Sequence, residues 1–144
     1  MSVKIKLDKK AIDKIFLDTL FKSVLKLHAL AIQNAPSGAT NDLRQKIDFF
    51  PKQWGAYNYK VISQASYSAA VESGTKPHAV SPRHLMEWAR LKLGDEKAAW
   101  PVAMKIKKFG TDAHPFMYPA YLEVREIWVK QYLKQELSKR GINI

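Results

Sequence analysis

The sequence has no cysteine, only six glycines and no apolar run as long as a membrane-spanning helix requires. The absence of cysteine excludes a disulfide scaffold, a thiolate metal site and a cysteine nucleophile, and it suits a reducing compartment. Because crossing a bilayer takes roughly 18 consecutive apolar residues, we expect no membrane contact. The first residues carry no signal-peptide hydrophobic block, so we expect a soluble, unprocessed chain.

Motifs for catalysis and metal binding are also missing. The four histidines have no metal-like spacing, and no HExxH or carboxylate–histidine motif is present. The only adjacent acids, Asp95 and Glu96, lie at an expected helix start, where the helix dipole stabilises them. The glycines form no phosphate-binding loop. We therefore expect no catalytic residue, no metal and no cofactor, and a protein that is not an enzyme.

The charge of the chain is strongly basic and unevenly distributed. The 144 residues include 24 Lys+Arg and 13 Asp+Glu, for a net charge of +11. The excess lies in residues 1–35, with seven lysines against three aspartates, and in residues 76–110, with eight basic against three acidic residues. This charge favours acidic partners or nucleic acid but does not form a dedicated basic arm. The length predicts a single domain over residues 1–144.

A long helix is expected over residues 8–34, with Asp8 as its cap and an end before Pro36. Its apolar residues fall in two rows at three- and four-residue spacing. One row is Ile12, Ile15, Phe16, Leu20, Val24, Leu27 and Ala31, and the other is Leu17, Phe21, Leu25, Ala29 and Ile32. The combined face is wider than a small domain usually covers. Either the helix lies deep in its own core, or the second row contacts a neighbouring subunit.

Three strands are expected after this helix. Alternating or β-prone residues occur at Leu43 to Phe49, Tyr57 to Ile62 and Tyr67 to Glu72. Their short connections favour an antiparallel meander. The hairpin tip at 53–56 carries Trp54, which either contacts a partner or folds back onto the core.

Proline and glycine delimit three further helices. They are expected from Pro82 to Gly94, from Pro101 to Gly110 and from Pro119 to Arg140. The buried side of the last helix is expected to be Ala120, Val124, Ile127, Trp128, Leu133 and Leu137. The predicted fold class is α+β: an antiparallel sheet of about three or more strands, packed by a long N-terminal helix, a long C-terminal helix and shorter helices between them.

Three short motifs punctuate the chain. The first is Ala35-Pro36 with a glycine-bearing loop and Leu43-Arg44, the second runs from Tyr67 to Thr75, and the third is Gly110-Thr111 followed by His114 to Ala120. This succession resembles the gene-product-ten-like family, the neck or tail-completion proteins of bacteriophages with long non-contractile tails. The residues that carry the resemblance are Pro36, Gly38, Leu43, Tyr67, Val71, Glu72, Gly74, Thr75, Gly110, Thr111, Pro115, Phe116, Pro119 and Ala120. The sequence departs from the family pattern at Ser68, where alanine is usual, at Met117, where leucine is usual, and in the first loop.

The resemblance implies a structural virion protein that acts by self-association and docking. It implies a homo-oligomeric ring, of six- or twelve-fold symmetry, at the head–tail junction or at the top of the tail. The implied partners are other neck and tail proteins, namely head-completion or adaptor, tail-terminator and tail-tube proteins. The implied location is the virion, and the host cytoplasm during assembly.

Several surfaces are candidates for these contacts. A closed ring requires a heterologous interface, in which one surface fits a different surface of the next copy. The candidates are the helix row with Leu17, Phe21 and Leu25, the Trp54 tip, and the segment 76–94. Lys105, Lys107 and Lys108 are candidates to face acidic neighbours or packaged DNA, although lysines also suit a helix C-terminus. The alternative function is a small basic nucleic-acid-binding protein, which the net charge supports.

Overall fold

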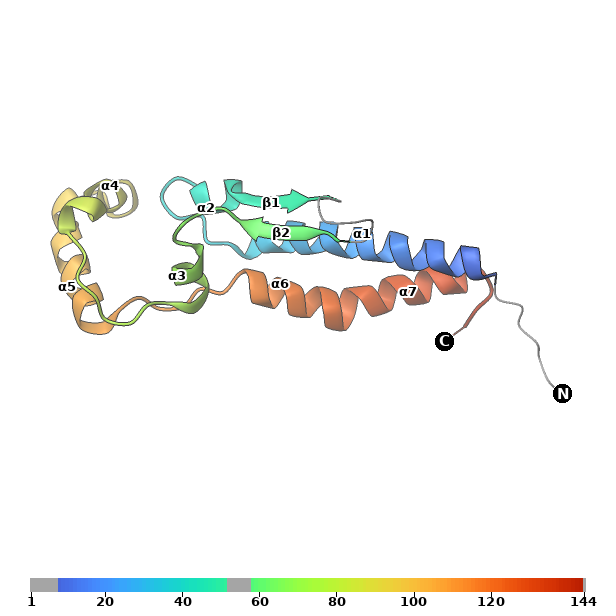
Figure 1. Cartoon of the computed structure of the whole chain (residues 1–144). Coiled ribbons are helices and arrows are strands. Elements are labelled where there is room, and N and C mark those ends of the chain that lie inside the picture. Colours follow the sequence, from blue (N-terminus) through green and yellow to red (C-terminus); the bar gives the residue numbers. More distant parts are fainter. Residues whose placement is uncertain (1–7, 52–57, 144) are drawn as a thin grey trace.

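The computed structural model describes residues 8–51 and 58–143, which form an elongated, mainly helical molecule (Figure 1). The long helix α1 (Lys9–Asn34) lies in the middle. On one side it carries an antiparallel hairpin of β1 (Ile47–Phe50) and β2 (Lys60–Ser63). On the other side lie α6 (Met117–Glu123) and α7 (Val129–Ser138), joined by a π-helical turn (Val124–Trp128). The expected combination of a long first helix, a long last helix and antiparallel strands is confirmed.

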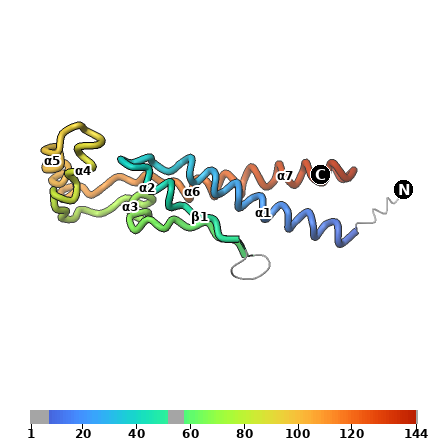
Figure 2. Tube along the Cα trace, turned by 90° about the horizontal axis from the view of Figure 1, so that it is seen from above, coloured from blue at the N-terminus to red at the C-terminus, as the bar shows by residue number. Residues whose placement is uncertain are grey.

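A helical hairpin forms one end of the molecule (Figures 1 and 2). It consists of α4 (Pro82–Leu93), a 3₁₀ turn (Glu96–Ala98) and α5 (Ala99–Phe109). Only small side chains are buried in it, namely those of Ala89, Ala99 and Ala103. Two non-helical segments, 74–81 and 110–116, connect this hairpin to the rest of the chain. The segments are joined to each other by a β-bridge between Thr75 and Thr111.

The main core lies between α1, the strand hairpin and α6. Its buried members are Leu30, Ala31, Ala35, Leu43, Ile47, Ala65, Phe116, Ala120 and Val124. Phe116 is the largest fully buried side chain among the described residues, with 1% of its surface exposed. Four of the other eight members are alanine, so this core contributes less burial energy than its number of residues suggests.

The start and end of α1 follow the sequence prediction. The Asp8 carboxylate accepts a hydrogen bond from the Lys10 N–H at 3.1 Å, which caps the helix. The helix ends at Asn34, two residues before Pro36, as the restriction on residues before proline predicts.

The first expected strand is wrong in its N-terminal half. Residues Asp42–Gln45 form a short helix, α2, and β1 begins only at Ile47. Leu43 and Ile47 are both buried, whereas Gln45 between them is exposed. A spacing of four between buried residues is typical of a helical turn, and a strand would have placed Gln45 on the same face as both.

The third expected strand is also wrong, because Ser68–Ser73 form a helix, α3. The described part of the chain therefore has a sheet of two strands in place of the expected three or more. Ala69 and Ala70 favour a helix by intrinsic propensity. The helix also directs Glu72 toward the last helix, a contact that no local pattern reveals.

The other helices lie where proline and glycine predict them, with small shifts. Helix α4 begins at Pro82 and ends before Gly94, whose φ of +74° suits glycine. Helices α5 and α6 each begin two residues before the expected proline, because proline is tolerated in the first turn. Ile127, expected to be buried, is 52% exposed. The π-helical turn adds a residue to the helix at this point and shifts the buried face.

Candidate functional site

The side chain of Glu72, in the second motif, binds the start of the last helix, in the third motif. Its Oε2 atom accepts hydrogen bonds from the backbone N–H groups of Phe116 at 2.8 Å and Met117 at 3.0 Å. Its Oε1 atom accepts one from the N–H of Tyr118 at 2.9 Å. The first N–H groups of a helix have no partner within the helix, so this carboxylate serves as a cap from 44 to 46 residues away.

The pKa of Glu72 reflects this arrangement. Partial burial of the carboxyl acts to raise its pKa, but the three backbone N–H groups outweigh burial and hold the pKa below its ordinary value. The carboxylate is therefore ionised at neutral pH and complements the positive end of the helix dipole.

Two glycines allow the connecting segments to approach each other closely. Thr75 and Thr111 exchange backbone hydrogen bonds of 3.0 and 3.2 Å, and their hydroxyl oxygens are 2.9 Å apart. A Cβ atom on Gly74 would lie 2.5 Å from the Thr111 carbonyl oxygen, and one on Gly110 would collide with the Thr75 carbonyl. Both glycines also have positive φ, of +71° and +76°, which other residues rarely adopt. The glycine–threonine pairs of the second and third motifs thus form one joint.

The first motif is connected to the second through Tyr67. The Tyr67 hydroxyl donates to the Asp42 carboxylate at 2.8 Å, and Lys46 forms an ion pair with the same carboxylate at 2.9 Å. Burial and then the Asp42 carboxylate raise the pKa of Tyr67 to about 12. The three motifs of the sequence therefore meet in space, and the threonine bridge joins the two segments that lead into and out of the α4–α5 hairpin.

A groove of about 740 Å³ lies between the α4–α5 hairpin and the rest of the chain. Its walls are the loop 36–40, the start of α2, residues of α3 and its N-terminal side, and the face of α4 that carries His84, Trp88 and Leu91. Trp88 is 37% exposed and Leu91 is 51% exposed, so large apolar side chains line an open surface. Among the residues that the structure describes, its lining includes the acidic residues Asp42 and Glu87 and no lysine or arginine.

Large apolar side chains are exposed on both halves of the molecule. On α1, Phe16 is 58% exposed although it was expected to be buried, and Leu20 is also exposed. The side of α1 that is buried contains Thr19 and Ser23, whose hydroxyls donate to backbone carbonyls of the same helix at 2.7 Å. On the remaining elements the exposed side chains are Ile62, Tyr67, Trp88, Leu91, Leu93, Trp100, Met104, Phe109, Tyr118, Tyr121 and Ile127.

The candidate interface residues of α1 lie in two environments. The ring of Phe21 packs within its own chain, with ring centroids 6.0 Å from Phe49 and 5.6 Å from Tyr59. Leu17 and Leu25 flank it on the same row and are each 39% exposed. Phe21 therefore packs against Phe49 and Tyr59 of its own chain. Of the three candidate interface residues on α1, Leu17 and Leu25 are the ones exposed to solvent. Trp54 lies outside the described residues.

The three candidate lysines lie on the last two turns of α5. Lys105, Lys107 and Lys108 are all exposed. Together with Met104 and Phe109 they surround a shallow hollow of about 480 Å³, and the Lys108 Nζ lies 5.0 Å from the centre of the Phe109 ring. This end of α5 therefore presents a surface that is both basic and apolar.

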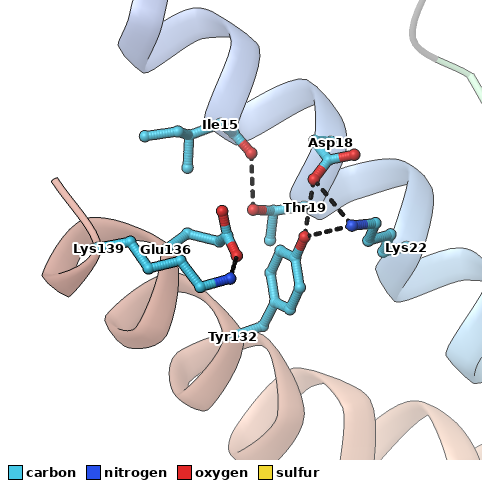
Figure 3. A network of polar contacts seen from close by, with 7 residues as sticks. All are labelled: Ile15, Asp18, Thr19, Lys22, Tyr132, Glu136 and Lys139. Carbon is cyan, nitrogen blue, oxygen red and sulfur yellow. Dashed lines mark hydrogen bonds and ion pairs between the residues drawn. The ribbon is translucent and has the colours of Figure 1, made fainter.

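A polar network joins α1 to α7 (Figure 3). The Tyr132 hydroxyl donates to the Asp18 carboxylate at 2.7 Å and accepts from the Lys22 Nζ at 2.8 Å. The Tyr132 hydroxyl, and then Lys22, lower the pKa of Asp18. The ring of Tyr132 also stacks on Trp128, with centroids 4.9 Å apart. The network fixes the two long helices against each other and is open to solvent.

Residues 8–51 and 58–143 contain no group of three or more histidine, aspartate or glutamate side chains arranged to hold a metal ion. Within the same ranges, no helix combines the length and the apolar character needed to span a lipid bilayer.

Comparisons with protein-family models, with characterised proteins and with solved structures find no significant match. The sequence pattern predicts Glu72 at the end of a strand, and its role as a cap of α6 was not predicted. One signal points to this role: the residue immediately before α6 is Phe116, where a serine, threonine, aspartate or asparagine would be expected, so the last helix has no local side-chain cap.

Proposed function

We propose that this protein is a structural component of a bacteriophage or prophage particle, and that its copies form a ring at the head–tail junction or at the top of the tail. It acts by self-association and by docking on neighbouring neck and tail proteins, and it turns over no substrate. The order of the three motifs in the sequence supports the choice of particle. Self-association is supported by the surface of the chain.

The observation that carries the proposal is the amount of large apolar side chain left exposed. Phe16, Met104, Phe109 and Tyr118 are each more than half exposed, and they lie on α1, α5 and α6. Met104 and Phe109 adjoin the same hollow at the end of α5, and contiguous exposed apolar surface is typical of interaction sites. Full burial of an exposed side chain of this size contributes about 1.5–3 kcal/mol. Covering the exposed part of several of them contributes a fraction of that value for each and favours an interface.

Native mass spectrometry and negative-stain electron microscopy of the purified protein test self-association over a range of concentrations. We expect a ring of defined stoichiometry, six- or twelve-fold, in equilibrium with smaller species. A second arm deletes the gene from its phage or prophage and examines the particles. We expect heads and tails that do not join, and joined particles on complementation. Normal particles from the deletion strain would contradict the proposal.

A second candidate function is binding of nucleic acid. The observation in its favour is the end of α5, where Lys105, Lys107 and Lys108 are exposed beside Phe109. Lysines attract phosphates without reading sequence, and an aromatic ring can stack on a base. A salt titration of DNA binding by the wild type and by K105E/K107E/K108E tests this function. Tight, saturable binding by a monomer that the triple substitution abolishes would favour it over the ring.

A further inference from the structure

The groove beside α4 has a chemical character opposite to that of most of the chain. The protein carries a net charge of +11, yet the charged side chains that line the groove are the carboxylates of Asp42 and Glu87. Asp42 is already paired with Lys46 and Tyr67. Glu87 is exposed and forms no ion pair within the described ranges, so its negative charge is open to a ligand.

The apolar part of the groove is built by large side chains on α4. His84, Trp88 and Leu91 recur at four- and three-residue spacing and so share one face of the helix. The fully buried Ala89 lies on another side of α4, and α4 packs against α5. The groove face is therefore not used to hold the α4–α5 hairpin together. An occupant of the groove must offer apolar side chains with positive charge beside them.

The outer face of α5 has these properties. Trp100, Met104 and Lys108 form one row at four-residue spacing, and Lys105 and Phe109 form the adjoining row. Trp100 is 51%, Met104 64% and Phe109 65% exposed. The inner face of the same helix carries the buried Ala99 and Ala103, so the outer rows point away from α4. One chain thus carries an acidic apolar groove and a basic apolar helix face on different sides of the same hairpin.

We propose that the groove lined by Trp88, Leu91 and Glu87 receives the outer face of α5, with Met104, Lys105 and Lys108, from a second copy of this chain. The inference rests on the self-association proposed above and specifies which surfaces meet. Charge complementarity and the matching apolar side chains select this occupant. Because groove and helix face are different surfaces, the contact is heterologous, and it leaves one groove and one α5 face free at the ends of every open chain. A ring closes these two free ends.

The absence of cysteine allows a direct test by site-specific cross-linking. Two variants with tags of different size, E87C and K108C, are mixed at high protein concentration and treated with a bifunctional maleimide. We expect a covalent dimer that contains one copy of each variant. The control pairs E87C with S138C, because Ser138 is exposed near the C-terminal end of α7. We expect at least a tenfold lower yield of that dimer.

A charge exchange provides an independent readout. E87K places a positive charge in the groove, and K105E/K108E places negative charges on α5. We expect each variant alone to self-associate at least tenfold more weakly than the wild type, and their equimolar mixture to recover most of the wild-type association. E123K and K134E are the matched controls, since both residues are exposed on other helices. They should associate like the wild type.

The outcomes separate this inference from the proposed function. If the wild type forms rings but E87C and K108C do not cross-link, or if the two charge variants associate normally, the groove receives something else and the inference is overturned while the ring function stands. If the wild type forms no assembly at any concentration and no cross-link appears, both are overturned.

Discussion

Replacement of Glu72 by glutamine tests the cap on the last helix, because the substitution removes the charge and keeps the shape. The carboxylate accepts three backbone hydrogen bonds, from consecutive N–H groups at 2.8, 3.0 and 2.9 Å. Glutamine retains one acceptor oxygen and replaces the other with a donor, which faces N–H groups that also donate. A hydrogen bond to a charged group contributes about 1.5–3 kcal/mol, and loss of a helix cap costs about 0.5–2 kcal/mol. We expect E72Q to lower the free energy of unfolding by about 2 kcal/mol at neutral pH.

The same interaction predicts the pH dependence of this difference. The pKa of Glu72 in the folded chain lies below the ordinary value of 4.5. The contribution of the carboxylate is therefore fully present above pH 4.5 and is lost as the pH falls through the folded-state pKa. Once the carboxyl is protonated in both the folded and the unfolded chain, the wild type and E72Q differ little.

Urea denaturation followed by far-UV circular dichroism, at neutral and at acidic pH, measures both effects. The control is E123Q, since Glu123 is an exposed carboxylate near the end of α6. Its free energy of unfolding should stay within about 0.5 kcal/mol of the wild type. An E72Q protein as stable as the wild type at neutral pH, or a difference that persists unchanged in acid, would refute the cap.

Three further predictions concern the joint and the core. G110A should lower the free energy of unfolding by more than about 2 kcal/mol, because its Cβ collides with a backbone carbonyl and its φ is +76°. G94A, with a similar φ of +74° and open space around it, should cost about 1 kcal/mol in the same denaturation experiment. F116A should cost about 3–5 kcal/mol because it empties the largest buried site, whereas Y118A, at an aromatic residue that is 61% exposed, should cost far less. In an ultraviolet titration, Tyr67 should ionise only near pH 12, and Y67F should remove that late step. Because the folded-state pKa of Tyr67 is raised above 10.0, its contribution to stability is complete below pH 10.0 and is lost as the pH rises toward 12.

The longer helices were predictable because residues close to their ends determine where each helix begins and stops. The Asp8 cap of α1, Pro82 at the first position of α4 and the glycines after α4 and α5 each act within one turn of the helix they delimit, whereas the Ser81 side chain makes no capping hydrogen bond. Such signals depend on nearby backbone groups and so survive in any fold. The predictions for α2 and α3 were wrong because a sequence of four to six residues is compatible with both a strand and a helical turn. At Leu43 and at Tyr67 to Glu72, contacts with distant parts of the chain decide between the two.

The organisation of the candidate site could not be predicted from local pattern. The second and third motifs were both visible, but the hydrogen bonds between Glu72 and the start of α6 span 44 to 46 residues. Local sequence pattern also does not determine whether an apolar side chain is buried or exposed. Phe16 lies in an apolar row that predicts burial, and it is 58% exposed. An amphipathic row indicates that a helix face requires a partner and does not tell whether that partner is in the same chain.

The distribution of side-chain size between core and surface connects the fold to the proposed assembly. In the described part of the chain, seven of the thirteen buried hydrophobic residues are alanine. Alanine brings backbones close but buries little area. Polar contacts supplement this core: the Glu72 cap joins α3 to α6, and the threonine bridge joins the two segments that lead to the α4–α5 hairpin. The larger apolar side chains of Trp100, Met104 and Phe109 are 51%, 64% and 65% exposed, so at least half of the surface of each residue stays in contact with water in the isolated fold. The burial energy of that exposed part is gained only when another surface covers it. The specificity of that contact then depends on charge, since apolar burial has no direction and Glu87 and Lys108 carry opposite signs.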